Sequence, residues 1–202
     1  MVLSGQLPAG CSITENGIVD RLVIGKTPVR EAMRRLVIEG LLEVTPRLGY
    51  TVSPITRADA DELYKVREVV ECACAELACE ALDDGQIDRL VELSDIGFDP
   101  NDPESVTAYV GVNLEFHGII AYGGGNRRLG DLAMTLMQES RRFIQITVLT
   151  AELGRAVREQ HLVIAEAFRA RDRIAVAEAC RYHVLDSHRV TVESLDAVHS
   201  TV

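Results

Sequence analysis

Three histidines and one asparagine carry the spacing in this 202-residue chain that best suits metal chemistry. Asn113 and His117 are four residues apart, so they share one face of a helix. His161 and His183 lie in two later segments with helical patterns. Imidazole nitrogens that converge inside a helical bundle suit zinc, nickel or manganese. The residues alone leave a second interpretation open, in which each histidine is a hydrogen-bonded core residue without a metal.

A second set of residues suits contact with nucleic acid. Residues 26–40 read KTPVREAMRRLVIEG, and their apolar stripe at helical spacing consists of Val29, Ala32, Met33 and Leu36. On the opposite face, Lys26, Arg30 and Arg34 stand four apart in one line. Thr27 lies at the N-terminal end of that face. A recognition helix enters the major groove with such a face, where Arg and Lys reach guanine edges or phosphates. An ordinary solvated basic face fits this helix equally well.

The segment after this helix favours the first interpretation. Residues 41–46 and 50–55 are two short runs with β-branched residues, joined by a turn over Arg47, Leu48 and Gly49. A helix followed directly by a small hairpin with an arginine at its tip is typical of a winged helix. Residues 13–23 predict a shorter helix before the recognition helix, with Ser12 or Thr14 as its cap. Its predicted inner face consists of Ile18, Val19 and Leu22.

From residue 57 onward the pattern predicts helices only, and we expect a mostly α protein in two domains. Residues 1–56, the head, predict a winged helix-turn-helix; residues 57–202, the body, predict an all-helical antiparallel bundle. The predicted helices of the body span about 58–82, 84–97, 103–123, 127–149, 152–170 and 173–196. Five cysteines without a CxxC pair indicate reduced, apolar core residues rather than disulfides or a thiolate metal site.

Charge is distributed unevenly along the chain, whose formal net charge is −10. Residues 1–57 hold seven Lys and Arg against five Asp and Glu, a balance of +2, so residues 58–202 carry −12. Phosphate contact needs local positive charge rather than a positive total, so the head remains a candidate DNA binder. No apolar run approaches the roughly 20 residues that span a bilayer, and no signal peptide is recognisable. We therefore expect a cytoplasmic protein without membrane contact.

The head resembles the DNA-binding domain of the GntR family. The resemblance lies in SGQLPAG and in KTPVREAMRRLVIEGLLEVTPRLGYTV, which are similar to the family's SGxLxPG and TPVREALRRLxxEGLV followed by a PxRG wing. It implies DNA contact from Lys26, Thr27, Arg30 and Arg34, and from the wing tip at Arg47 and Gly49. The family pattern has a full helix before SGxL, and here only Met1 to Leu3 stand in its place, so the first helix is expected to be truncated. Further departures from the family pattern are Asn16, Gly17 in what is expected to be the middle of a helix, Val23, Gly25 and Leu48.

The body resembles the FCD ligand-binding domain of the FadR subfamily. The resemblance lies in DELYKVREVVE, NLEFHGIIAYGGGNRRL, REQHLVIAEAFRARD and CRYHV. It implies that His117, His161 and His183 bind a divalent metal ion, and that position 113 supplies a fourth ligand. The family usually has Asp there and this chain has Asn113, which lowers the expected affinity. His188 and His199 match nothing in the pattern and are expected to be solvated.

Such domains commonly anchor a small organic acid at the metal. Arg67 matches an arginine of the family's first sensor helix and is our candidate for gripping the effector carboxylate. A surface salt bridge from Arg67 to Glu68 or Glu71 is an equally weighted alternative. Arg141 and Arg142 are weaker candidates, and Asn126 is expected to cap a helix.

Together these patterns predict a transcription repressor. Its homodimer would read a pseudo-palindromic double-stranded DNA operator, and a small carboxylate would control that binding. The alternative is a helical metal-binding or acid-binding protein whose degenerate head no longer binds DNA. An enzyme is not expected, because no phosphate loop, nucleophile motif or paired acid and base is present.

Overall fold

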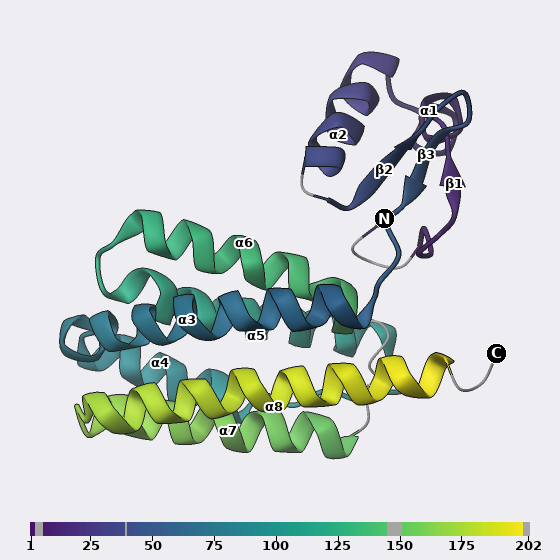
Figure 1. The fold of residues 1–202 in the computed structure, drawn as a ribbon. Coiled ribbons are helices and arrows are strands. Elements are labelled where there is room, and N and C mark those ends of the chain that lie inside the picture. Colours follow the sequence, from purple (N-terminus) through teal and green to yellow (C-terminus); the bar gives the residue numbers. More distant parts are fainter. Residues whose placement is uncertain (3–5, 39, 145–150, 200–202) are drawn as a thin grey trace. The chain divides into compact units, whose positions relative to one another are not determined.

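The computed structural model describes residues 1–2, 6–38, 40–144 and 151–199 of the chain (Figure 1). Side chains at 142, 144, 151, 152, 198 and 199 lie outside the described set, so Arg142 and His199 cannot be placed. The chain divides into two compact units, Met1–Thr56 and Arg57–Val202. Within the described part of the chain, no helix combines the length and apolar character that crossing a membrane requires.

The head is a winged helix-turn-helix, as the sequence predicts. Helix α1 spans Glu15–Leu22 and the recognition helix α2 spans Lys26–Ile38. Strands β1 (Ser12–Ile13), β2 (Leu42–Thr45) and β3 (Gly49–Val52) form an antiparallel sheet in the order β1-β3-β2. The β2–β3 hairpin is the wing.

Helix α1 differs from its prediction in three ways. Ile13 belongs to β1, so the helix starts later, with the Thr14 side chain accepting a hydrogen bond from the Gly17 amide at 3.1 Å. Gly17 therefore lies in the first turn rather than in the middle of the helix. Leu22 is 44% exposed and does not belong to the inner face. After α1, Val23 adopts a left-handed φ of 55°, which β-branched residues rarely do.

Helix α2 contributes the centre of the head's small core. Val29 and Met33 are buried, whereas Ala32 is exposed, so the predicted stripe was wrong at that position. Leu36 and Val37 are half-buried and complete the inner face. These side chains pack against Ile13, Leu42 and Val52 of the sheet.

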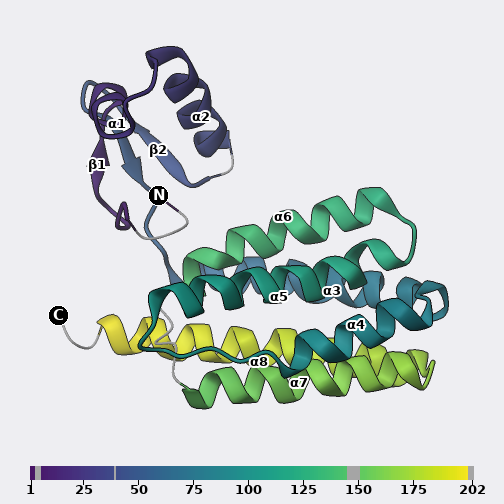
Figure 2. The same cartoon turned by 180° about the vertical axis from the view of Figure 1, so that it is seen from behind.

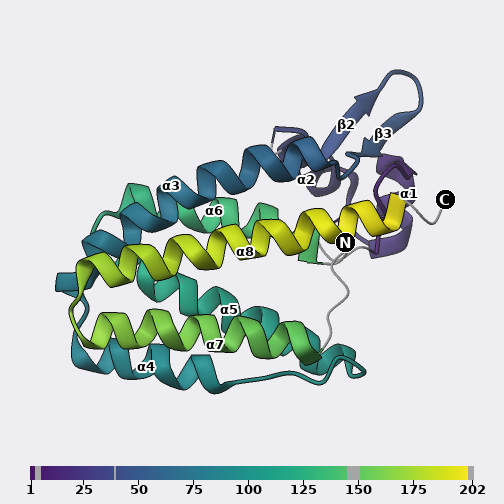
Figure 3. The same cartoon turned by 60° about the horizontal axis from the view of Figure 1, so that its bottom comes forward.

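The body contains six helices within the described ranges, in agreement with the predicted number. They are α3 (Arg57–Ala81), α4 (Asp84–Asp95), α5 (Pro103–Gly123), α6 (Arg127–Ile144), α7 (Ala151–Arg169) and α8 (Arg173–His199). Helix α8 lies alongside α3 and α7, as Figure 3 shows. Helix α5 packs on α3, α4 and α6, and comes forward in Figure 2.

Local signals set the helix ends of the body. Asp83 forms a capping box with Gln86 at the start of α4, and Asp102 precedes Pro103 at the start of α5. The Asn126 side chain accepts a hydrogen bond from the Leu129 amide at 3.2 Å, as expected of a cap.

The core of the body is apolar and includes four of the five cysteines. Phe116, Phe168, Leu90 and Ile164 are buried at its centre. None of the five cysteines forms a disulfide, and the buried ones are Cys72, Cys74, Cys79 and Cys180. Burial raises the pKa of the Cys74 thiol to about 11, so this cysteine is a protonated apolar residue at neutral pH.

Candidate functional site

Helices α5, α7 and α8 bring His117, His161 and His183 together inside the body. All three side chains are buried. The ring centroids of His117 lie 5.2 Å from those of His161 and of His183, and the last two lie 4.8 Å apart. One nitrogen atom from each ring lies within 4.8 Å of the other two. The three histidines are therefore close enough to share one ion.

The surroundings keep these imidazoles neutral. Burial lowers the pKa of all three histidines well below the ordinary value, because a charged ring loses its water. Neighbouring positive charge lowers it further: His161 and Arg67 act on His117, and His183 acts on His161. Each neutral ring has one nitrogen lone pair to offer, the form in which histidine binds metals.

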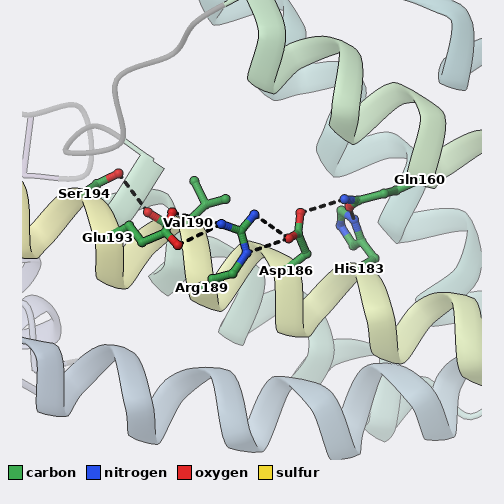
Figure 4. A network of polar contacts seen from close by, with 7 residues as sticks. All are labelled: Gln160, His183, Asp186, Arg189, Val190, Glu193 and Ser194. Atoms are coloured by element: carbon green, nitrogen blue, oxygen red, sulfur yellow. Dashed lines mark hydrogen bonds and ion pairs between the residues drawn. The ribbon is translucent and has the colours of Figure 1, made fainter.

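Hydrogen bonding determines which nitrogen of His183 carries the proton. Its Nδ1 lies 2.8 Å from Oε1 of Gln160, while Nε2 of Gln160 donates to Asp186 at 2.7 Å (Figure 4). Because the amide oxygen faces the ring, Nδ1 of His183 donates and its Nε2 keeps a lone pair. Such outer hydrogen bonds orient histidine ligands in metal sites.

The other two histidines have orphaned nitrogens. Nε2 of His117 and Nε2 of His161 are buried and have no hydrogen-bond partner among the described residues. A buried polar atom without a partner costs roughly 1–3 kcal/mol. A divalent ion would take up these lone pairs, so the residues fit zinc, nickel or manganese. Asn113, one turn before His117, lines the same cavity and could add an amide oxygen.

Glu71 is a neighbour of this cluster that the sequence did not identify as part of a site. Its Oε2 lies 3.5 Å from Nδ1 of His117, and its side chain is 10% exposed. The carboxylate favours the proton on Nδ1 and leaves Nε2 of His117 for a metal. One sequence signal could have identified Glu71, namely its position. Arg67 and Glu71 are four residues apart and lie on the same face of α3 as the buried Val70 and Cys74.

Arg67 is buried beside the histidines rather than exposed. Its side chain is 3% exposed, and its Nε donates to Glu71 at 2.7 Å. The predicted pair with Glu71 therefore exists, but as a buried ion pair and not as a surface salt bridge; Glu68 pairs with Arg181 instead. Burial lowers the pKa of Arg67, but Glu71 and Tyr64 together more than offset this effect, so the net shift is upward and the guanidinium stays charged.

A cavity of about 110 Å³ opens beside the cluster, several times the space that one water molecule needs. Arg67, Asn113, His117 and His183 all line it, so the structure brings the predicted effector residue and most of the predicted ligands to one cavity. Arg141 is half-buried and is not among the described residues that line it.

His188 was expected to be solvated, and this was wrong. Its Nε2 lies 2.8 Å from Oδ1 of Asp61, and its ring lies 5.2 Å from that of Tyr64. The residue is half-buried between α3 and α8, because those two helices are neighbours along their length.

In the head, the predicted DNA-contact residues of α2 share the solvent-exposed side. Lys26, Thr27, Arg30 and Arg34 are all exposed. The Nε of Arg30 donates to both carboxylate oxygens of Glu15 at 3.2 Å, which the sequence did not predict. That hydrogen bond lowers the pKa of Glu15, so the carboxylate is ionised at neutral pH.

The two predicted DNA-contact residues of the wing tip differ: Arg47 is exposed, whereas Gly49 has a structural role. Arg47 is exposed in the turn between β2 and β3. Gly49 has a φ of +108°, and a Cβ there would lie 2.6 Å from the Ile13 carbonyl oxygen. Glycine is thus required at 49 by the close approach of β1, a reason independent of DNA.

Comparisons with known proteins match both units. The FCD domain family matches residues 62–186, and the family described as bacterial regulatory proteins, gntR family, matches residues 1–52. The uncharacterized HTH-type transcriptional regulator YdhC of Bacillus subtilis (strain 168) is 26% identical over 187 residues, or 92% of this chain and 81% of that protein. The HTH-type transcriptional regulator McbR of Escherichia coli (strain K12) is 26% identical over 181 residues, or 88% and 80%.

Two solved structures share the fold over nearly the whole chain. E. coli McbR/YncC has a TM-score of 0.76 at 23% identity, and the match covers 98% of this chain and 92% of the McbR/YncC chain. A putative transcriptional regulator GntR from Rhodococcus sp. RHA1 has a TM-score of 0.76 at 21% identity, and the match covers 95% of this chain and 92% of the Rhodococcus chain.

These relatives are transcription regulators and not enzymes, and the FCD match is consistent with the FadR subfamily. Regulators of this kind bind DNA operators and typically dimerise. The chain therefore belongs to the GntR family of bacterial transcription regulators, in the branch that carries an FCD domain.

Proposed function

We propose that this regulator is a repressor that a small organic acid releases from its operator. The acid binds in the cavity of the body, next to a divalent ion held by His117, His161 and His183, with Asn113 as the fourth protein ligand. Lys26, Thr27, Arg30 and Arg34 of α2, with Arg47 of the wing, contact the operator.

The observation that carries this proposal is the pair of orphaned nitrogens in the cluster. Nε2 of His117 and Nε2 of His161 are buried without a described partner, although each costs stability in that state. A merely structural histidine core would be expected to satisfy these atoms. The cluster borders a cavity that Arg67 also lines, so the bound ion and the guanidinium would offer their positive charge to a carboxylate at one place.

Each group has a separate task in binding the acid. The ion, when bound, supplies positive charge that attracts a carboxylate in a site shielded from water. Arg67 adds a planar guanidinium, held in place by Glu71 and by a contact of its Nη2 with Sδ of Met137 at 2.9 Å. Gln160 fixes the ring of His183 from outside the cluster. The acid controls DNA binding only if its affinity differs between the two states of the regulator.

Operator binding by the purified full-length chain tests this proposal. We expect fluorescence anisotropy to detect binding to a fragment from upstream of its own gene. The affinity should fall by about 100-fold or more between 50 and 200 mM salt, because several phosphate contacts release counterions. In the zinc-loaded protein, a carboxylate that fits the cavity should lower the affinity further. Absence of salt-sensitive binding to any such fragment contradicts the proposal and favours a body with a degenerate head.

We further propose that two copies associate through helix α3, so that two heads read a pseudo-palindromic operator. Val66, Val69 and Leu77 are 46%, 70% and 46% exposed and follow one another at helical spacing on one face. Exposed apolar side chains in such a row are typical of a surface that a partner covers.

Placing a charge in this row is expected to separate the two copies. Val69→Glu should shift the protein from dimer to monomer in light scattering after size-exclusion chromatography, because a carboxylate would be buried without a partner. Val163→Glu on α7, at a side chain 60% exposed, is the matched control and should stay dimeric. If both variants remain dimers at micromolar concentration, the interface does not include this row.

A further inference from the structure

The walls of the cavity change character along its length. On α5, Tyr109, Asn113 and His117 are spaced four residues apart and all line the cavity. The eight residues from Tyr109 to His117, a little over two helical turns, rise about 12 Å along the axis. On α7 the lining likewise changes from polar to apolar, from Gln160 to Val157, within one helical turn. The cavity therefore has a polar end at the histidines and an apolar end about two turns away.

Two aromatic rings close the apolar end. The rings of Phe98 and Tyr109 lie 4.7 Å apart at an angle of 39°. Phe98 rests directly on α7, since a Cβ at Gly154 would lie 2.5 Å from Cε1 of Phe98. This packing fixes the ring at the end of the cavity. Leu153 and Val190 also line the cavity and add aliphatic surface to its apolar lining.

Tyr109, which lines this apolar part of the cavity, has an unsatisfied polar atom. The Tyr109 hydroxyl is buried and has no hydrogen-bond partner among the described residues. Burial raises the pKa of Tyr109 to about 12, so the hydroxyl is neutral at physiological pH and can donate or accept. A ligand that reaches this atom with a hydroxyl or carbonyl group would satisfy it.

The charges around the cavity suit one carboxylate and not two. Arg67 is the single Lys or Arg among the described residues that line it. Arg158 is close enough to Tyr109 to influence its hydroxyl, but it does not line the cavity, and its Nη2 pairs with Asp95 at 3.1 Å. A second carboxylate at the apolar end would lose its water without gaining a cation from that lining, which is costly.

The carboxylate that does line the cavity is already neutralised. Both Nε and Nη2 of Arg189 donate to Oδ1 of Asp186, at 3.0 and 2.7 Å, and Gln160 donates to the other oxygen at 2.7 Å (Figure 4). Asp186 therefore offers no free charge to an amino group on the ligand, and its own bonds keep it from repelling an acid.

We propose that the effector is an aromatic monocarboxylic acid with a neutral hydrogen-bonding group, such as a hydroxyl, on the ring opposite its carboxylate. This inference rests on the proposed function and names the ligand class of the same site. The carboxylate lies at the end with Arg67, the ring fills the apolar span, and the distal hydroxyl bonds to Tyr109. A short hydroxy acid such as lactate would leave the apolar span and the Tyr109 hydroxyl unfilled.

Calorimetric titration of the zinc-loaded full-length protein tests the ligand class. The probes are 4-hydroxyphenylacetate, phenylacetate, octanoate, succinate and lactate. We expect 4-hydroxyphenylacetate to bind at least about tenfold more tightly than succinate or lactate, and several-fold more tightly than phenylacetate, because a buried donor otherwise stays unpaired. Equal or tighter binding of succinate or lactate overturns the inference, and equal binding of octanoate overturns its aromatic part.

Tyr109→Phe separates the role of the hydroxyl from that of the cavity shape. The variant should lose the preference for 4-hydroxyphenylacetate over phenylacetate while keeping its affinity for phenylacetate. Tyr182→Phe, on an exposed tyrosine of α8, should change neither value. A preference that persists in Tyr109→Phe overturns the assigned contact. If succinate binds best and releases the operator, this inference fails and the proposed function stands; if no probe binds, the inference fails while operator binding is judged separately.

Discussion

Replacing His161 by phenylalanine is expected to abolish tight zinc binding and, in the same protein, to stabilise the metal-free fold. The His161 ring stacks on Phe116 with centroids 4.0 Å apart and planes within 7°, a contact that a phenyl ring keeps. The substitution removes the orphaned Nε2, whose burial costs roughly 1–3 kcal/mol. We therefore expect the free energy of unfolding in EDTA to rise by about 1 kcal/mol. Thermal unfolding with EDTA and with zinc measures both effects.

His161→Phe is expected to lose the response to zinc but to gain stability without metal. These two effects together distinguish a metal site from a structural histidine core. Zinc should raise the melting temperature of the native protein and leave that of His161→Phe unchanged, because binding to the native state is what stabilises it. His188→Phe changes a histidine outside the cluster and should retain the zinc response. Asn113→Asp should tighten zinc binding by about tenfold, since it adds a charge. Loss of stability in EDTA with an unchanged zinc response in His161→Phe would show that no metal binds at this cluster.

The helices and the convergence of the histidines could be predicted because both depend on local periodicity. Apolar residues at helical spacing and breaks at Asp83, Pro103 and Asn126 determine the helices of the body. The four-residue step from Asn113 to His117 fixes a shared face before any tertiary structure is known. The resemblance to a family then identified which histidines belong together.

The parts that could not be predicted depend on contacts between distant segments. Strand β1 consists of two residues, and it exists because Ser12 and Ile13 pair with Thr51 and Tyr50. So short a strand has no readable periodicity, and the sequence pattern therefore predicts that Ile13 belongs to a helix. Likewise, the burial of Glu71 depends on where α5 and α8 pack on α3, which the pattern along α3 alone does not determine.

Operator binding is expected to depend on Arg30 more than on any other single side chain of α2. Its position between Lys26 and Arg34 puts it at the centre of the exposed basic face. Arg30→Ala should weaken operator binding by about 100-fold or more per dimer, since each lost bidentate contact costs about 1–3 kcal/mol. The melting temperature should change little, because the Arg30 side chain is 47% exposed and its ion pair lies at the surface. Arg35→Ala removes the same charge from another face and should cost about threefold or less.

Removing the charge of Glu15 is expected to have the opposite effect and to strengthen operator binding. Its carboxylate holds Arg30 at 3.2 Å and would also repel phosphates, so the pair must open or reorient when DNA binds. Glu15→Gln should therefore tighten operator binding several-fold. In the Arg30→Ala background the same change should have a smaller effect, because the competition for the guanidinium no longer exists. Equal effects of Glu15→Gln in both backgrounds would mean that Glu15 acts only through its general charge. A gain in the native background alone would identify the ion pair as a restraint on operator affinity within the head itself.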